Sequence, residues 1–296
     1  MTIYELAAVA AATLWAFGGM ISATPSRELG AVAYVHIRMV IIGVMLTIYM
    51  LIAGTWDTIQ TEHYQPLVLS GFIGIFLGDS SLFLTLNRLG PRRTAIVFSL
   101  AAPFSVILGW MFLGEHLSLL QIIGVIIVSL GVVLAVVFGK RKAQQHQWEA
   151  IKGPLWIGVS IGVFAALCQS VGSILARPVM AAGADPVAAS VIRVVTSAMF
   201  LTILVRLPIK SVKRRNPLTP KLLWLTVFAG VNGMGVGMTL FLFALEGGEV
   251  GIISTLSATS PALLLPMLWI KTKEVPAIGA WVGAGMAVVG SALLFV

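Results

Sequence analysis

The sequence predicts an all-α integral membrane protein, and three observations lead to that prediction. Its 296 residues are 58% hydrophobic and only 10% charged, and the mean hydropathy is +1.01. In soluble domains about a quarter of the residues are charged. The apolar residues form runs of about 20, the length of a helix that crosses a hydrocarbon layer about 30 Å thick. Strands of a transmembrane barrel would be about half as long and would alternate in polarity.

Ten apolar runs follow one another along the chain, separated by polar residues or by Gly and Pro. The runs lie near residues 3–23, 31–53, 65–86, 92–113, 118–138, 153–176, 185–206, 220–244, 249–270 and 276–296. Each run is long enough for one crossing, because a helix rises about 1.5 Å per residue. The fold is therefore predicted to contain ten transmembrane helices.

Basic residues in the links between these runs predict the orientation of the chain. Most Lys and Arg residues lie in odd-numbered links: Arg27, Arg88, Arg92, Arg93, Lys140, Arg141, Lys142, Lys152, Arg206, Lys210, Lys213, Arg214, Arg215, Lys221, Lys271 and Lys273. The even links and both termini contain only Arg177. Because Lys and Arg are enriched in short cytoplasmic links, the odd links are expected in the cytoplasm. The protein is then expected in the cytoplasmic (inner) membrane with both termini outside.

The two halves of the sequence, 1–145 and 146–296, resemble each other. The segment "AVAYVHIRMV" at 31–40 recurs as "PVAASVIRVV" at 186–195. Glycines and prolines recur too: Gly71, Gly74, Gly78, Pro103, Gly124 and Gly131 match Gly230, Gly233, Gly237, Pro261, Gly283 and Gly290. Each half contains five predicted helices, and an odd number inverts the second half relative to the first. Inverted repeats of this kind form one transport domain in many secondary transporters, with the substrate site near the midplane between them.

The segment "LAAPFSVILGWMFLGEHLSLLQIIGVIIVSLGVVL" at 100–134 resembles the fourth and fifth helices of EamA-type members of the drug/metabolite transporter superfamily. It has their proline, Leu-Gly-Glu turn and two spaced glycines. The segment at 256–294 is similar more loosely, because Lys273 interrupts it and the glutamate is shifted to Glu274. The resemblance covers nearly the whole chain. It implies a ten-helix carrier, often an exporter of amino acids or other small metabolites, and it does not specify the substrate.

Arg38 and Arg193 lie at matching positions of the two repeats, inside predicted helices. A charged residue at membrane depth costs at least about 2.5 kcal/mol on insertion scales, so it needs a partner, an exit or a function. We favour a structural role in which each side chain snorkels toward its own face, because family members with unrelated substrates also have an arginine here. The alternative is a clamp for a substrate carboxylate, which a guanidinium binds through two hydrogen bonds.

Asp79 is the only acidic residue well inside a predicted helix, and its counterpart in the second repeat is Met238. A carboxylate within the membrane is a candidate for proton coupling or for binding an amine. The alternative is a structural carboxylate that is bonded to Ser80, Asn87 or Arg88.

Pro103 and Pro261 lie near the middle of the fourth and ninth runs. Each proline removes a hydrogen bond to the carbonyl four residues earlier, at Ser99 or Ser257, and should bend its helix. Freed carbonyls at membrane depth must be buried in protein or face water. The segments "FSLAAP" and "SATSP" are therefore predicted to line a cavity, and a simple packing kink is the alternative.

Aromatic side chains are further candidates for the cavity wall. Trp15 lies near the middle of the first run, followed by Phe17 and by Gly18 and Gly19, which loosen the helix. It is expected to present a flat apolar wall to a substrate or, alternatively, to face lipid or a neighbouring helix. The remaining predicted cavity residues are Tyr34, Phe98, Gln169 and Asn232.

These features favour a secondary transporter that moves a small polar metabolite by alternating access. The resemblance makes an exporter of amino acids or related compounds the first hypothesis. Organic cations or amines, whether drug-like or quaternary ammonium compounds, are the alternative substrates, which Trp15, Phe17, Tyr34 and Asp79 would bind through cation–π and charge contacts. A non-transport membrane scaffold is the alternative from another class, although the links are too short for a soluble domain.

Other function classes are not expected. Paired carboxylates and His-rich metal spacings are missing from the sequence, so neither enzymatic activity nor a metal or other cofactor is predicted. No GxxxxGK[ST] segment occurs, so the energy must come from gradients, with protons as a candidate coupling ion. The expected partners are a small-molecule substrate and membrane lipid, not nucleic acid, and the protein is expected to be a monomer or weak homodimer. Glu115, in a tight outer turn, is expected to cap a helix or stabilise the turn.

Overall fold

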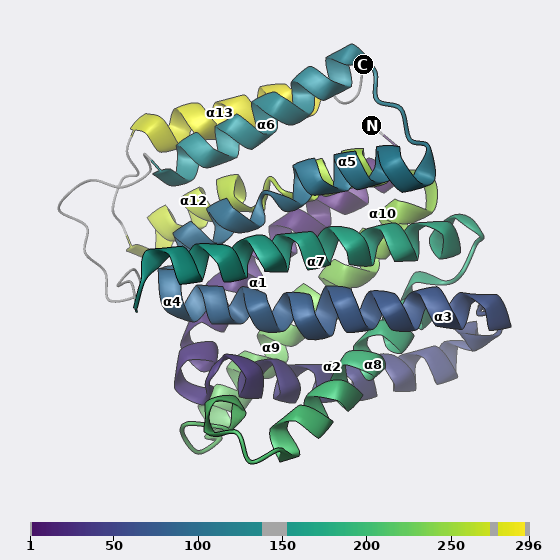
Figure 1. The fold of residues 1–296 in the computed structure, drawn as a ribbon, viewed down its shortest axis with the longest axis vertical. Coiled ribbons are helices and arrows are strands. Elements are labelled where there is room, and N and C mark those ends of the chain that lie inside the picture. The colour runs from purple at the N-terminus through teal and green to yellow at the C-terminus, as the bar shows by residue number, and fades with distance from the viewer. Residues whose placement is uncertain (1, 138–152, 273–277, 294–296) are drawn as a thin grey trace.

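The computed structural model describes residues 2–137, 153–272 and 278–293, and the regular structure in these ranges is helical (Figure 1). The α-helices are α1 (Ile3–Leu29), α2 (Ala31–Ala53), α3 (Thr61–Ser70), α4 (Gly78–Phe98), α5 (Ala101–Leu113), α6 (Leu119–Val137), α7 (Leu155–Ala181), α8 (Pro186–Arg206), α9 (Pro220–Gly230), α10 (Met238–Gly247), α11 (Val250–Ser257), α12 (Ser260–Thr272) and α13 (Ile278–Leu293). Two π-helices, η2 (Gly71–Leu77) and η5 (Val231–Gly237), join α3 to α4 and α9 to α10. Short 3₁₀ turns occur at η1 (Thr55–Thr58) and η4 (Lys210–Val212).

Six helical segments among the described residues are long and apolar enough to cross a membrane. They are Ile3–Leu29, Ala31–Ala53, Thr61–Pro91, Leu155–Ala181, Pro186–Arg206 and Pro220–Gly247. Three shorter apolar helices are Ala101–Leu113, Leu119–Gly131 and Val250–Leu264. An all-helical membrane protein is thus confirmed, whereas the number of crossings remains a prediction.

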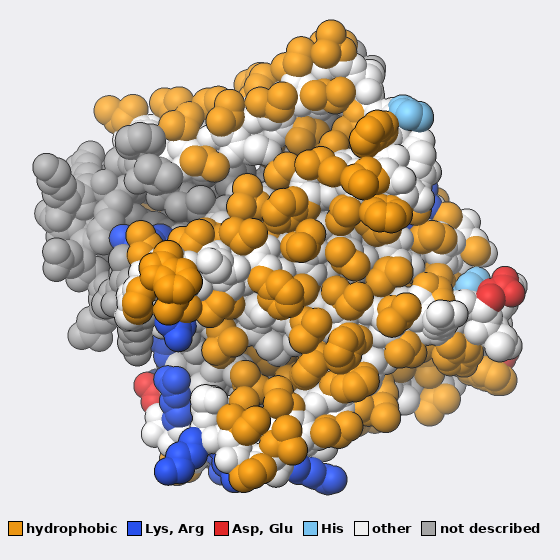
Figure 2. Space-filling model, in the orientation of Figure 1, with side chains coloured by type: hydrophobic (Ala, Val, Ile, Leu, Met, Phe, Trp, Pro, Cys, Tyr) orange, Lys and Arg blue, Asp and Glu red, His pale blue; other side chains and the backbone are white. Residues whose placement is uncertain are grey.

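The long helices run side by side in alternating directions, so the links gather at two opposite ends of the molecule (Figure 1). Lys and Arg side chains are concentrated at one of these ends (Figure 2), which includes Arg27 in the last turn of α1 and Arg206 in the last turn of α8. The charge asymmetry of the sequence is therefore also an asymmetry of the folded molecule. The basic residues at 140–152 and Lys273 lie outside the described residues.

The two halves of the chain interlock through their glycine-rich π-helices. A Cβ atom built on Gly71, at the start of η2, would lie 2.5 Å from the carbonyl oxygen of Arg193 on α8. In the second half, a Cβ on Gly230 would lie 3.0 Å from Cγ of Arg38 on α2. The first residue of η2 and the last residue of α9, directly before η5, thus pack closely on the arginine-bearing helix of the other half, where glycine leaves the space.

The same relation holds for α1 and α7. A Cβ on Gly172 of α7 would lie 2.9 Å from Cα of Gly74, and a Cβ on Gly18 of α1 would lie 3.7 Å from Cα of Gly233. Small residues at helix crossings let backbones approach closely in membrane proteins. The repeated glycines therefore position four helices around the centre of the molecule. At one edge, α13 packs along α6, with Gly290 against Val128 (Figure 1).

The turn after α5 ties the two halves together. Glu115, which follows α5, accepts a hydrogen bond from the backbone N–H of Val250 at 2.8 Å and from that of Gly251 at 3.4 Å. It therefore caps α11, a helix of the other half, in line with the expected capping role.

We expect Gly71→Ala to lower the free energy of unfolding by about 1–3 kcal/mol, the usual cost of overpacking a core. The new methyl group would overlap the backbone of Arg193, which cannot move away as a side-chain tip could. Gly19→Ala is the matched control, because a Cβ on Gly19 meets nothing within 4 Å. Thermal unfolding in detergent measures both variants. Equal melting temperatures for the two would contradict the close approach of α8 to η2.

Candidate substrate cavity

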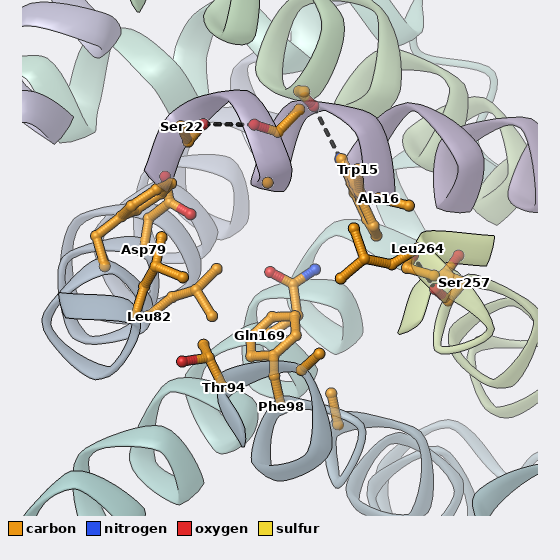
Figure 3. A pocket seen from close by; sticks show the side chains of 18 of the residues that line it. Trp15, Ala16, Ser22, Asp79, Leu82, Thr94, Phe98, Gln169, Ser257 and Leu264 are labelled. Carbon is orange, nitrogen blue, oxygen red and sulfur yellow. Dashed lines mark hydrogen bonds between the residues drawn. The ribbon is translucent and has the colours of Figure 1, made fainter. Parts of the chain in front are cut away.

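A cavity lies between α1, α7, α10 and two pairs of helices that are each separated by a short turn, α4–α5 and α11–α12 (Figure 3). Its free volume is about 1250 Å³, which includes the part open to solvent. The aromatic and methionine residues of the wall are Trp15, Phe83, Phe98, Met234, Met238 and Phe241. The polar and charged residues are Ser22, Arg38, Asp79, Thr94, Ser99, Gln169, Ser254, Ser257 and Ser260.

Two predicted helices are interrupted where the sequence analysis expected only bends. A turn at Ser99 and Leu100 separates α4 from α5, and a turn at Ala258 and Thr259 separates α11 from α12. Pro103 is the third residue of α5. Proline is tolerated in the first turn of a helix, where its missing N–H would have no partner. The prolines therefore begin new helices, and the expected continuous bent helices are wrong.

The carbonyl groups that the prolines leave free find other donors nearby. The carbonyl oxygen of Ser99 accepts a hydrogen bond from the N–H of Ala102 at 3.1 Å. That of Ser257 accepts one from the hydroxyl group of Ser260 at 2.7 Å. Both serines also line the cavity, as does Phe98. Polar backbone at this depth is thus satisfied within the protein, as the apolar surroundings require.

An ion pair lies in the cavity wall between Arg38 on α2 and Asp79 on α4. The Nη2 group of Arg38 donates to Oδ2 of Asp79, and both side chains are almost fully buried. The guanidinium carbon lies 4.6 Å from the centre of the Phe83 ring and 5.4 Å from that of Tyr34. Arg38 therefore does not snorkel to an interface, and Asp79 pairs with Arg38 instead of Ser80, Asn87 or Arg88.

Tyr34 packs against the Arg38 guanidinium of this ion pair. Its ring is completely buried, and its hydroxyl group donates to Oγ of Ser22 at 2.8 Å. The Ser22 hydroxyl group in turn donates to the carbonyl oxygen of Gly18 at 2.7 Å. Tyr34 is therefore a supporting residue of the wall and not, as predicted, one that lines the cavity.

Arg193 occupies the equivalent position in the second half, in different surroundings. It is fully buried, and Nη1 contacts the Met238 sulfur at 3.3 Å. Its Nε and Nη2 groups have no hydrogen-bond partner in the part of the chain that the structure describes. Snorkelling is wrong for Arg193 as well. The repeat thus places an Arg–Asp pair in one half and an Arg–Met contact in the other.

Trp15 and Gln169 face the same space from opposite helices, α1 and α7 (Figure 3). The Nε1–H group of Trp15 donates to the carbonyl oxygen of Gly233 at 2.8 Å, and its ring lies 5.3 Å from that of Phe241. Gly233 belongs to η5, and π-helices are common at functional sites. The Nε2 group of Gln169 is buried and has no hydrogen-bond partner within the described ranges.

The structure does not bring all predicted residues to the cavity. Phe17 packs against Phe228 at a ring distance of 6.0 Å. Asn232 donates to the carbonyl oxygen of Phe228 at 2.8 Å, within its own helix. Pro103 is absent from the residues that line the cavity, and the side chain of Pro261 lies outside the described residues.

Sequence reasoning missed several apolar residues of the wall, including Phe83, Phe241 and Met234. Phe83 lies four residues after Asp79, and residues with that spacing share a helix face. This spacing could have identified it. Phe241 and Met234 carry no comparable signal, because nothing in an apolar helix distinguishes a cavity face from a lipid face.

These features define a multi-pass membrane carrier built from two repeated halves around a largely apolar cavity. The model of the EamA-like transporter family matches residues 2–137 and 156–296, one match in each half. The chain belongs to the EamA-like transporter family and is a membrane transporter.

Solved structures agree with this fold. One, titled "Crystal structure of protein", is similar over 98% of this chain and 95% of its own, with a TM-score of 0.77 and 19% sequence identity. At that identity the likeness concerns the fold alone. No curated protein sequence matches the chain significantly.

We expect Asp79→Leu to lower the free energy of unfolding by about 3–5 kcal/mol, because it leaves the Arg38 guanidinium buried without its partner. The double variant Arg38→Met/Asp79→Leu should lose much less, since it removes both charges. Melting temperatures and the monodisperse yield in detergent compare the two. A double variant as unstable as the single one would show that the ion pair does not determine the stability of this wall.

Proposed function

We propose that the protein is a secondary transporter that exports small zwitterionic metabolites, amino acids or related compounds, across the inner membrane by alternating access. The observation that carries this proposal is the wall of the cavity, in which one ion pair of zero net charge lies among apolar and aromatic side chains. Arg38 and Asp79 together offer a cation and an anion to a ligand that carries both charges.

The apolar wall supports a ligand of zero net charge. Transfer of an unpaired ion into apolar surroundings is very unfavourable. Each charge of a zwitterion can instead pair with the opposite charge of Arg38 or Asp79. Its carboxylate would bind Arg38 through two hydrogen bonds, which are strong when both groups are ionised. Trp15, Phe98 and Phe241 would contact the apolar body of the ligand.

The position of the cavity supports loading from the cytoplasm. On α1 it is lined by residues between Trp15 and Ser22, in the half that leads to Arg27. On α4 it is lined by residues from Asp79 to Phe98, on both sides of the basic residues Arg88, Arg92 and Arg93. We propose ten membrane crossings with this basic end in the cytoplasm, so that a metabolite made in the cell reaches the cavity directly.

Organic cations remain the second candidate, favoured by the aromatic wall and Asp79. The Asp79 carboxylate is, however, already bonded to Arg38. A lone cation would have to separate this pair and leave the Arg38 guanidinium unneutralised.

Three compounds with one apolar body distinguish the candidates: phenylalanine, phenethylamine and 3-phenylpropionate. We expect phenylalanine to raise the melting temperature of the purified protein most, because a ligand that binds the folded state stabilises it. It should also exchange across proteoliposomes that contain the protein. Gln169→Leu should weaken binding about threefold to tenfold, the scale of one hydrogen bond.

Gln121→Leu is the matched control, because the side chain of Gln121 accepts a hydrogen bond from the backbone N–H of Ser118 at 3.0 Å and does not line the cavity. Stabilisation by phenethylamine alone would favour the cation candidate instead. No exchange of any of the three compounds would contradict this proposed function.

The proposed orientation has its own test. A reporter that is active only in the cytoplasm should be silent when fused after Val296. The same reporter inserted into the link between Arg206 and Lys221 should be active, because that link has the highest basic charge. The reverse result would place the cavity toward the outside.

A further inference from the structure

Arg193 is a buried cation that the proposed function does not use. Its side chain is fully buried between α8, η2 and α10, and two of its nitrogen groups have no hydrogen-bond partner in the described ranges. A charge in the interior of a membrane protein is costly and marks a functional position by default. Its counterpart Arg38 is neutralised by Asp79. Of these two equivalent cations, Arg193 is the one that still lacks an anion among the described residues.

One side chain separates Arg193 from the cavity. Met238 lines the cavity, and its sulfur accepts the Nη1–H group of Arg193 at 3.3 Å. A thioether sulfur is a weak acceptor, and methionine is unbranched and changes conformation easily. A ligand carboxylate at this place would be a much stronger acceptor, because a guanidinium binds it through two charge-assisted hydrogen bonds.

The surroundings of Met238 favour such a movement. Met238 is the first residue of α10 and directly follows the π-helix η5. A π-helix contains one more residue per turn than an α-helix, so a change to α-helical bonding would rotate the residues at its end. Asp79, its counterpart in the repeat, is the second residue after η2. The repeat therefore supplies an anion at one of the two places and a displaceable side chain at the other.

We propose that Arg193 is a second, concealed subsite that binds the carboxylate of the transported compound once Met238 moves aside. The inference deepens the proposed function and rests on it, because the carboxylate first binds Arg38 and passes to Arg193 once Met238 has moved. Charge supports the assignment. Arg38 and Asp79 are the charged residues of the cavity wall among those described, and they neutralise each other. An ammonium group could then contact Asp79 while the carboxylate binds Arg193.

A cysteine in place of Met238 tests the subsite without knowledge of the substrate. In a Cys168→Ala background, Met238→Cys removes the tip of the side chain that covers Nη1. Two thiol reagents of similar size serve as probes, the anionic sulfonatoethyl methanethiosulfonate and the cationic trimethylammonioethyl methanethiosulfonate. Leu264→Cys is the matched control, because Leu264 is an apolar residue of the same cavity on another helix.

We expect the ratio of the anionic to the cationic rate to be at least tenfold higher at position 238 than at position 264. Both introduced thiols lie in the same cavity, so the difference between the two ratios isolates the charge behind Met238. Adding Arg193→Met should make the two ratios, at position 238 and at position 264, about equal. If that variant does not fold, protection of the thiol at position 238 by 3-phenylpropionate but not by phenethylamine provides the second measurement.

Equal ratios at the two positions would overturn the inference. So would a thiol at position 238 that reacts with neither reagent while the thiol at position 264 reacts. These outcomes are separate from a failure of the proposed function. A protein that exchanges phenylalanine but shows equal ratios keeps its function without this subsite. A protein with the expected ratio that exchanges none of the three compounds keeps the anion subsite and loses the proposed function.

Discussion

The rest of the structure depends on one constraint, the close contact that a glycine at the start of η2, and another directly before η5, makes with the arginine-bearing helix of the other half. Gly71 meets the backbone of Arg193, and Gly230 meets the side chain of Arg38. These contacts hold both guanidinium groups at the centre of the molecule, away from either interface. They also place Asp79 and Met238, each within two residues of the end of a π-helix, beside those groups. Helix packing thus determines which side chains face the cavity.

The two arginines show how one geometry can support two chemical environments. A buried cation with a bonded carboxylate is neutralised in place, whereas a buried cation beside a thioether is not. The repeat creates equivalent positions, and the difference between Asp79 and Met238 removes their equivalence. An asymmetric ligand such as an amino acid requires a site that distinguishes its two ends. The substitution of one residue between the repeats provides that distinction.

Much of the fold could be predicted from the sequence, because lipid requires long apolar helices and limits basic residues to the links. The internal repeat was visible in the spacing of Gly and Pro, and the resemblance to EamA-type carriers rested on such motifs.

The ion pair of Arg38 with Asp79 was not predicted, since it joins residues on different helices and depends on how those helices pack. The π-helices were also missed, because glycines such as Gly74 indicate close packing but not an additional residue per turn. Trp15 and Phe17 could not be separated for a related reason. They lie on different faces of one apolar helix, and only tertiary packing decides which face borders the cavity.

The breaks between α4 and α5 and between α11 and α12 affect how the protein can change shape. Within a continuous helix such as α7, a change of tilt at the midplane would separate backbone hydrogen bonds that lipid cannot replace. At the breaks, the carbonyl groups of Ser99 and Ser257 are bonded to donors within three residues of the same turn. The helical segments on the two sides can therefore tilt about the turn while these local bonds stay intact. Rearrangement of the cavity wall then requires rotation of a few backbone angles and no loss of hydrogen bonds in the membrane interior.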